Sequence, residues 1–529
     1  MRDEVTRSDT KGDRKPNILL ILCDQLRADA LGCYGNPIVQ TPHLDRLARS
    51  GAVYEQCIVT QPTCTPSRAS ILTGCYPSAL RTRMVGCRTP DDPRFVTQAL
   101  ARAGYHTASI GKIHLRPQAE EPAAIAATRD ADGVYDYYGF QKIELVNGHG
   151  DKCFGPSYTP WLEAQTTPHA RAAQRQPRHY AHGTEDTYAY DLPLVVHPTT
   201  YIGDRAVEFL KRADDTPFFL HVSFPDPHQP FCAPERYAGM YQAEEMPPPL
   251  PPLDPQTMPP WYGEAYMGKS SPCVIDPPGA RVDRVTGTKP DDYQRYTVAD
   301  FQQTKAIYYG MVSLLDDTVG RILHTLHETG LDHDTVVIFM ADHGEYLGDY
   351  GLTGKGMLFH SALRVPLLVA GPGITGGQRI ADVASTLDIA PTLLDLANVA
   401  EPEAMQGISM RAQLIDNVSP VRQVAITEND DDFVPMRGRV LTTNEWKLVR
   451  YGGTPFGELY DRQTDPNEEH NLWNHPAYAE VQADLTQRLL DELLCSVDTL
   501  NGRVQIPRPL SGKLLRQNYT GGNDFLVSP

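Results

Sequence analysis

The sequence predicts an α/β protein with a large, doubly wound, mostly parallel sheet and a smaller C-terminal α+β subdomain. Two observations predict the large sheet. Short apolar runs rich in β-branched residues alternate with segments whose apolar residues recur every three or four positions, as in alternating strands and helices. Polar side chains directly follow several apolar runs, and ligands of open α/β sheets bind beyond the carboxyl ends of the strands.

Five apolar runs are expected to form strands of this sheet. In chain order they are Asn17–Cys23, Thr107–Gly111, Pro217–Phe224, Thr335–Ala341 and Val365–Ala370. The first four are followed by side chains that bind metals or move protons, namely Asp24 and Gln25, Lys112 and His114, His228, and Asp342 and His343. Because the carboxyl ends of parallel strands meet at one edge of a sheet, we expect these side chains to converge.

Two amphipathic helices are expected between the strands. One begins after Thr199 and Thr200 and runs to about Arg212. The other covers about Thr304–Thr329, because its apolar residues are spaced at i, i+3 and i+4, and Gly330 supplies its stop.

Two long stretches, 117–198 and 229–300, are expected to be loops. The second includes a proline-rich run at 246–252, which excludes a continuous helix or central strand there. Such insertions serve either as lids and binding loops or as surface wraps and subunit contacts, and both interpretations stay open. The same holds for His149 and Asp151, which either line a pocket or stabilise a glycine-rich loop.

The pattern changes at about residue 421. Short strands joined by turns are expected at Gln423–Thr427, Arg439–Thr442 and Trp446–Arg450, and an amphipathic helix is expected at about Glu480–Cys495. We therefore expect a catalytic α/β domain at residues 15–420, an antiparallel-sheet subdomain at 421–500 and a C-terminal tail at 501–529. The tail is a candidate subunit contact in a homo-oligomer.

Composition excludes several classes of partner. A net charge of -18 argues against nucleic acid, an anionic membrane surface and a long polyanion. The charged start lacks the apolar core of a signal peptide and no long apolar run follows, so a cytoplasmic location is expected. The 10 Cys form no C-x-x-C pair, which suggests neither a structural zinc site nor a dithiol redox motif.

The most informative run is residues 64–74, Cys-Thr-Pro-Ser-Arg-Ala-Ser-Ile-Leu-Thr-Gly. Arg68 lies one helical turn after Cys64, so both side chains can face one side, and a helix N-terminus at Cys64 would add positive potential for an anion. The run resembles the sulfatase signature, in which the Cys is oxidised to formylglycine. The resemblance implies that Cys64 is the precursor of an aldehyde nucleophile.

The resemblance to sulfatases extends from Pro16 to about Leu472. It rests on further motifs at Asn17–Asp24, Thr41–Asp45, Gly111–His114, Phe224–His228, Ala341–Gly356 and Glu458–Leu472. It implies an alkaline-phosphatase-like fold. By motif, Lys112, His114, His228 and Lys355 become catalytic residues together with Cys64 and Arg68.

The resemblance also implies one divalent cation, held by Asp24, Gln25, Asp342, His343 and an oxygen of modified residue 64. Carboxylate and amide oxygens suit Ca²⁺ or Mg²⁺, and a His ligand widens the choice to Mn²⁺ or Zn²⁺; we expect Ca²⁺. Gln25 stands where many members have Asp, and His343 where many have Asn. That combination occurs in a bacterial branch that includes phosphonate monoester hydrolases.

The implied reaction is hydrolysis of a small anionic sulfate ester, as in arylsulfatases. Hydrated formylglycine attacks sulfur, the metal stabilises the oxygens, and the signature Arg and both Lys neutralise charge. His228 and Lys355 are candidates for proton delivery to the leaving oxygen, and His114 would help expel sulfate. Maturation requires a formylglycine-generating system. The alcohol half of the substrate stays open.

Three rival interpretations were weighed. A phosphonate monoester or phosphodiester hydrolase would use the same site, and Gln25 and His343 favour it. A cysteine-dependent phosphatase needs C-x-x-x-x-x-R, and Arg68 comes too early for that spacing. A non-catalytic anion-binding relict would not need Cys64 with both Lys and both His retained.

Overall fold

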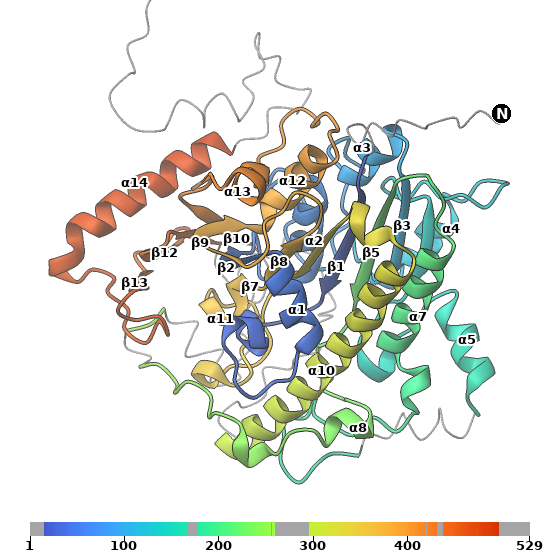
Figure 1. The fold of residues 1–529 in the computed structure, drawn as a ribbon. Helices are drawn as coiled ribbons and strands as arrows, with labels where there is room; N and C mark the ends of the chain where they lie inside the picture. The colour runs from blue at the N-terminus through green and yellow to red at the C-terminus, as the bar shows by residue number, and fades with distance from the viewer. Residues whose placement is uncertain are drawn as a thin grey trace, which may run out of the picture.

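The structure is a computed structural model that describes residues 15–167, 178–254, 257–259, 296–418, 420–430 and 437–496. Its main feature is a 9-stranded sheet in the order β4-β3-β5-β1-β6-β8-β2-β7, with β9 paired to β2 (Figure 1). The prediction of a large, doubly wound, mostly parallel sheet is therefore confirmed. The expected tail at 501–529 and residues 260–295 of the second expected loop lie outside the described residues.

The strands of this sheet have the bounds β1 (Asn17–Cys23), β2 (Ala52–Ile58), β3 (His106–Gly111), β4 (Lys142–Leu145), β5 (Phe218–Phe224), β6 (Thr335–Ala341), β7 (Arg364–Val365), β8 (Leu367–Ala370) and β9 (Gln378–Ser385). β4, β3, β5, β1 and β6 run parallel in that order. β8 is antiparallel to β6, and β2 is antiparallel to β8. The four strands that precede the candidate site residues are thus direct neighbours.

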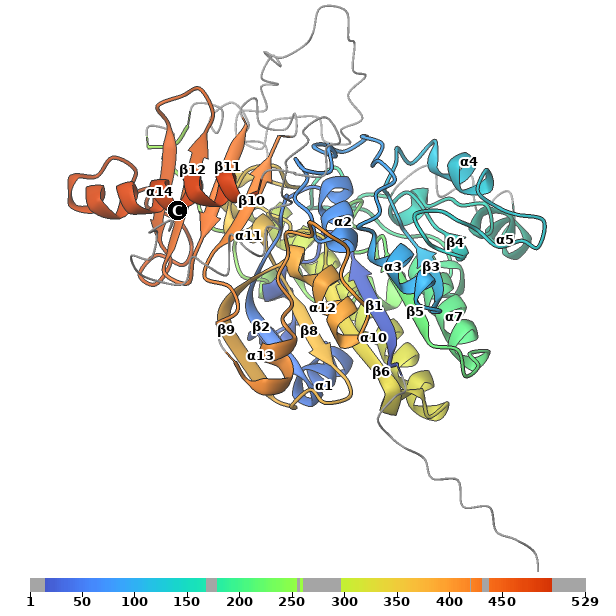
Figure 2. The same ribbon diagram turned by 90° about the horizontal axis from the view of Figure 1, so that it is seen from above.

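Helices cover both faces of the sheet. One face carries α1 (Pro42–Ser50), α7 (Pro198–Lys211) and α10 (Val298–Glu328), and the other carries α2 (Cys64–Thr73), α3 (Val96–Arg102) and α12 (Ile389–Leu396) (Figure 2). The shorter helices are α4 (Glu121–Ala126), α5 (Tyr158–Gln165), α8 (Glu235–Ala238), α11 (His360–Leu363) and α13 (Arg411–Asp416). This arrangement buries both faces of the central strands.

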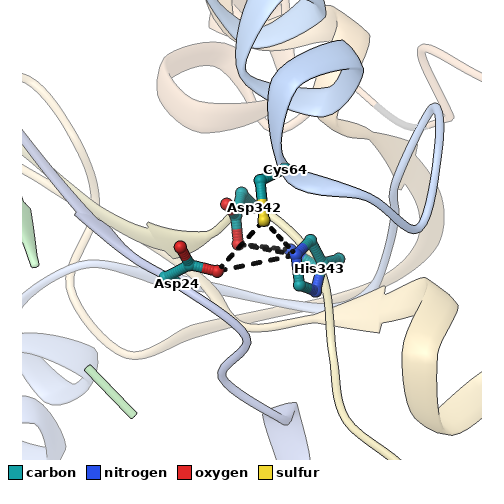
Figure 3. A group of neighbouring side chains, drawn as sticks. All are labelled: Asp24, Cys64, Asp342 and His343. Carbon is teal, nitrogen blue, oxygen red and sulfur yellow. Dashed lines mark hydrogen bonds and ion pairs between the residues drawn. The ribbon is translucent and has the colours of Figure 1, made fainter. Parts of the chain in front are cut away.

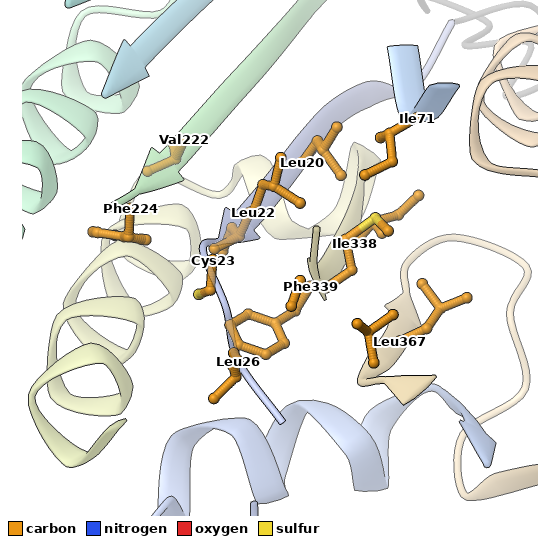
Figure 4. Close-up of a cluster of buried hydrophobic side chains, with 14 of the residues drawn as sticks. Leu20, Leu22, Cys23, Leu26, Ile71, Val222, Phe224, Ile338, Phe339 and Leu367 are labelled. Carbon is orange, nitrogen blue, oxygen red and sulfur yellow. The ribbon is translucent and has the colours of Figure 1, made fainter. Parts of the chain in front are cut away.

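The core is centred on β1, whose residues are all buried. Leu20 and Leu22 of β1 belong to one buried hydrophobic cluster with Ile338 of β6, Ile71 of α2 and Val222 of β5 (Figure 4). Burying a side chain of this size contributes roughly 1.5–3 kcal/mol. The strand ends that carry the polar groups are therefore fixed by a tightly packed frame.

Two of the differences from the predicted bounds have a clear physical reason. Helix α10 begins at Val298 rather than near Thr304, because Thr297 and Asp300 form a capping box that starts the helix earlier. The run Val365–Ala370 is divided between β7 and β8 at Pro366, which has no N–H to donate to a neighbouring strand. It also pairs antiparallel, with β2 and β6.

A 4-stranded antiparallel sheet in the order β10-β11-β12-β13 lies beside the large one. Its strands are β10 (Ala425–Asn429), β11 (Gly438–Thr442), β12 (Trp446–Tyr451) and β13 (Gly457–Asp461), and helix α14 (Ala479–Cys495) follows. The structure thus contains the expected antiparallel sheet and helix, with β10 shifted by two residues and β13 added. No described helix is long and apolar enough to cross a membrane.

Candidate active site

The four neighbouring strands β3, β5, β1 and β6 end at one place. The backbone N–H of Asp24, after β1, donates to the Phe224 carbonyl at the end of β5 (3.1 Å). The N–H of Asp342, after β6, donates to the Cys23 carbonyl (3.1 Å), and that of Lys112, after β3, donates to the Ser223 carbonyl (2.9 Å). Each of these backbone hydrogen bonds therefore links the residue that follows one strand to the end of a neighbouring strand.

Asp24, Cys64, Asp342 and His343 form a buried group of possible metal ligands (Figure 3). One ligand atom from each lies within 4.8 Å of the others. The Cys64 sulfur is 3.2 Å from His343 Nε2 and 3.5 Å from Asp24 Oδ1. His343 Nδ1 lies 3.0 Å from the Gly344 carbonyl, an arrangement in which Nδ1 donates and Nε2 keeps its lone pair for a ligand.

Cys64 is the first residue of α2, a helix in which every residue is buried. Burial, with the Asp24 carboxylate beside it, raises the pKa of the Cys64 thiol to about 11. The unmodified side chain is therefore a neutral thiol at physiological pH, and reactive cysteines usually have the opposite shift. The site does not prepare Cys64 to act as a thiolate.

Three cations surround this group. The Arg68 guanidinium donates to Asp342 Oδ2 (2.7 Å) and to Ser223 Oγ (2.8 Å). The Lys112 ammonium donates to the Asp24 carboxylate. Lys355 Nζ lies 3.4 Å from the Cys64 sulfur. Because the nearest carboxylates are Asp24 and Asp342, the centre carries an excess of positive charge suited to an anion.

Gln25 is held in a left-handed backbone conformation, with φ of 65°. Its N–H donates to Asp342 Oδ1 (3.0 Å), which fixes the residue beside the ligand group. Its side-chain oxygen accepts from Lys355 Nζ (2.6 Å), and its side-chain amide donates to Gln229 and Glu345. The structure therefore brings Gln25 to the site, with its amide oxygen directed to Lys355.

The sequence also matches known proteins. Residues 16–399 match the family model described as Sulfatase, and residues 348–493 match the C-terminal model of N-sulphoglucosamine sulphohydrolase. The chain belongs to the sulfatase family. As a member of that family, within the alkaline-phosphatase-like superfamily, it is a sulfuric ester hydrolase.

Individual relatives of this sulfatase include both sulfate and phosphonate enzymes. It is 29% identical to an arylsulfatase of Clostridium perfringens over 97% of both chains. It is 29% identical to the multifunctional alkaline phosphatase superfamily protein PehA of Trinickia caryophylli, over 92% of this chain and 96% of the relative. The crystal structure of phosphonate monoester hydrolase of Agrobacterium radiobacter superposes with a TM-score of 0.76 at 26% identity, covering 92% and 97% of the chains.

Three histidines of the sulfatase lie around the lysines. His228 Nε2 is 2.8 Å from Lys355 Nζ, and its ring stacks on that of His149, with centroids 3.7 Å apart. His114 is buried, and its Nδ1 has no hydrogen-bond partner among the described residues. Burial, with Lys112 or Lys355 nearby, lowers the pKa of all three well below the usual value, so each imidazole is neutral.

Two buried carboxylates that position site residues were not predicted from the sequence. Glu121 of α4 accepts the backbone N–H groups of His114 (3.1 Å) and Leu115 (3.0 Å), which holds His114 at a φ of 58°. Glu345 accepts from Gln25 and from the N–H of Gly354 (2.6 Å), next to Lys355. Glu345 lies inside the second metal motif, so its position there was a usable signal; Glu121 offered none.

Proposed function

We propose that this sulfatase hydrolyses a small anionic sulfate ester with formylglycine at position 64 and one divalent cation. The observation that carries the proposal is the surroundings of Cys64. The Cys64 thiol is buried and neutral, yet it lies among two carboxylates, an imidazole and three cations. Such surroundings suit an oxygen nucleophile beside a metal better than a thiolate.

The proposed cation ligands are Asp24, Gln25, Asp342, His343 and an oxygen of modified residue 64. Two carboxylates and a neutral imidazole whose Nε2 faces the Cys64 side chain fit a divalent ion. When bound, the metal would supply Lewis-acid stabilisation of oxygen anions. A mixed oxygen and nitrogen shell is compatible with Ca²⁺, which we favour, and with Mg²⁺, Mn²⁺ or Zn²⁺.

The proposed formylglycine supplies a hydrated aldehyde, a nucleophile that can release sulfate by C–O cleavage. Arg68, Lys112 and Lys355 would bind the ester anion and offset the charge that builds up in the transition state. Lys355 is well suited to hold a proton: burial alone would lower its pKa, but the Asp24 and Asp342 carboxylates act in the opposite direction.

Proton transfers are assigned to the same residues. The Lys355–His228 pair would deliver a proton to the leaving oxygen, since their nitrogens lie 2.8 Å apart. His114 would accept the proton that is lost when sulfate departs. Its neutral ring, with Nδ1 free of described partners, supports that role.

A phosphonate monoester or phosphodiester hydrolase remains the second candidate. Gln25 and His343 favour it, as does the similarity to the phosphonate monoester hydrolase of Agrobacterium radiobacter. Both reactions displace an alcohol in line from a tetrahedral, anionic centre, so the same cations would serve either. The Lys112 and His114 pair favours sulfate.

The deciding experiment compares one leaving group carried by three centres. We would measure kcat/KM for 4-nitrophenol esterified as sulfate, as phenylphosphonate and as phenyl phosphodiester. The proposal predicts the highest kcat/KM for the sulfate. A higher kcat/KM for either phosphorus compound would make the chain a phosphonate or phosphodiester hydrolase.

The proposal includes a formylglycine-generating system as the maturation partner. It also includes a division into a catalytic domain at residues 15–420 and a C-terminal subdomain at 421–500. The small sheet and α14 supply most of one hydrophobic cluster, to which the large domain adds Tyr76 and Leu387, and this supports the division. Hydrogen bonds such as Glu428 N–H to the Thr60 carbonyl (2.8 Å) join the two parts.

A further inference from the structure

His149 lies at the rim of the site on a glycine-flanked turn after β4. Gly148 and Gly150 have φ of 80° and 52°, the left-handed region that favours glycine. A Cβ on Gly148 would lie 2.5 Å from the Lys152 carbonyl, and one on Gly150 would lie 2.7 Å from the Cys232 sulfur. The backbone on both sides of His149 therefore needs glycine, which fixes where the imidazole is presented.

The imidazole of His149 makes two different contacts. Its Nε2 lies 2.7 Å from Lys112 Nζ, so it accepts from an ammonium that also donates to Asp24. Its ring lies flat on that of His228, with an interplanar angle of 10°. The His149 side chain is 20% exposed, whereas those of Lys112 and Asp24 are fully buried. His149 thus lies between the buried centre and solvent.

These contacts connect both halves of the machinery. Lys112 belongs to the anion-binding side, whereas His228, through its 2.8 Å contact with Lys355, belongs to the leaving-group side. Among the described residues, the nitrogens of the His228 ring hydrogen-bond to the Gln229 carbonyl (2.6 Å) and to Lys355. The stack on His149 is therefore what restrains the tilt of the His228 ring.

We propose that His149 is a positioning residue that holds the His228–Lys355 pair in line with the leaving oxygen of the ester while it fixes the Lys112 ammonium. The inference rests on the proposed sulfate ester hydrolysis. The stack and the hydrogen bond make separable contributions. Loss of the stack misaligns proton delivery, whereas loss of the acceptor nitrogen loosens Lys112.

Three variants separate the two contributions. His149→Phe keeps an aromatic face and removes the acceptor, His149→Gln keeps an acceptor and removes the stack, and His149→Ala removes both. His106→Ala is the matched control, because His106 is an exposed histidine at the far end of β3 whose ring lies tilted against that of Phe209, with centroids 5.5 Å apart.

The readout is kcat/KM for 4-nitrophenyl sulfate and for phenyl sulfate. The second has the more basic leaving oxygen and depends more on proton delivery. We expect His149→Ala to lose on the order of tenfold more on phenyl sulfate than on 4-nitrophenyl sulfate. His149→Phe should show the wild-type ratio of kcat/KM for the two esters but a raised KM. His149→Gln should show a wild-type KM but an altered ratio. His106→Ala should match the wild type.

Equal losses on both esters, or a Phe variant as impaired on phenyl sulfate as the Ala variant, would overturn the positioning role. Thermal unfolding and bound metal, measured on each variant, identify any that has lost its fold or its ion. If one variant has lost its fold or its ion, the intact Phe and Gln variants decide the question. A wild-type ratio of the two esters in both of them would also overturn the positioning role. A wild type that cleaves neither ester would instead overturn the proposed function.

Discussion

Buried charge around Cys64 is arranged for a metal and an anion together. Burial alone would raise the pKa of Asp24, but the Lys112 ammonium, with Arg68 nearby, lowers it well below the usual value. Asp24 is therefore ionised although it is fully buried. An ionised carboxylate with one oxygen on Lys112 and the other facing Cys64 is a prepared ligand.

Asp342 is the residue whose loss should affect the metal most. Asp342→Asn removes a charge at nearly constant shape and leaves Arg68 without its closest carboxylate. Mutation of a residue that only hydrogen-bonds to a metal ligand typically lowers metal affinity about 10–100-fold. We therefore expect at least that loss in metal affinity and in kcat/KM. Isothermal titration with the metal, and activity after chelation and re-addition, measure both.

His343→Asn is the matched comparison, because burial lowers the pKa of His343 to about 4 and the exchange is neutral for neutral. Its effect should be milder and should shift preference toward Ca²⁺, since an amide oxygen suits a hard cation better. A full complement of tightly held metal in Asp342→Asn would mean that the ion binds elsewhere. Undiminished activity in metal-free protein would rule out metal assistance.

The packing of α1 against α10 depends on a buried carboxylate. Asp316 of α10 accepts the backbone N–H groups of His43 (3.1 Å) and Leu44 (2.8 Å) in the first turn of α1. These are N–H groups that the helix itself cannot satisfy. Burial nevertheless raises the pKa of Asp316 to about 7.

This shift predicts a pH-dependent stability. In the unfolded chain Asp316 ionises near pH 4, so between about pH 4 and 7 only the folded state holds the proton. Its contribution is present below pH 4 and is lost as pH rises through 7. Asp316→Asn cannot ionise, so its melting temperature relative to wild type should improve from pH 5 to pH 8. A difference that stays constant over this range would contradict the raised pKa.

Elements that end at the site were predictable, whereas β2 and β9 were not. β1 and β6 match their predicted bounds because each is a continuous apolar run that is buried throughout. β2 was missed because Glu55 and Gln56 interrupt its apolar pattern where it is partly exposed. β9 alternates buried and exposed residues without a clear apolar run, so its pairing with β2 decides its structure.

The site shows the same division. Residues inside family motifs converge as expected, because each follows a buried strand. The role of Glu121 and the stacking of His149 on His228 could not be predicted, because these contacts depend on how separate loops meet in space. Local sequence patterns do not determine which loops contact one another.

At the scale of the whole molecule, a buried ion pair of the C-terminal subdomain also contacts the large domain. Lys447 Nζ on β12 donates to Glu468 (2.7 Å), and Glu468 also accepts the N–H of His360 at the start of α11 (2.9 Å). Both side chains of the pair are almost fully buried. Lys447 also lies over the rings of Phe359 and Tyr460.

Removal of one partner should destabilise the protein strongly. Glu468→Ala leaves the Lys447 ammonium buried without its carboxylate, which typically costs about 3–5 kcal/mol. The control is Glu55→Ala, which breaks the exposed pair with Arg379 and should cost under about 1 kcal/mol. Urea unfolding of both variants measures the difference. Equal free energies of unfolding would show that the buried pair does not stabilise the protein more than an exposed pair does.

The central claim is that the active protein carries formylglycine at position 64. The direct measurement is mass spectrometry of the tryptic peptide that ends at Arg68, on preparations whose specific activity has been determined. We predict the mass loss expected when CH₂SH becomes CHO, in a fraction that rises in proportion to activity, and no turnover by folded Cys64→Ala. A fully active preparation whose peptide retains the intact Cys64 thiol would contradict the account.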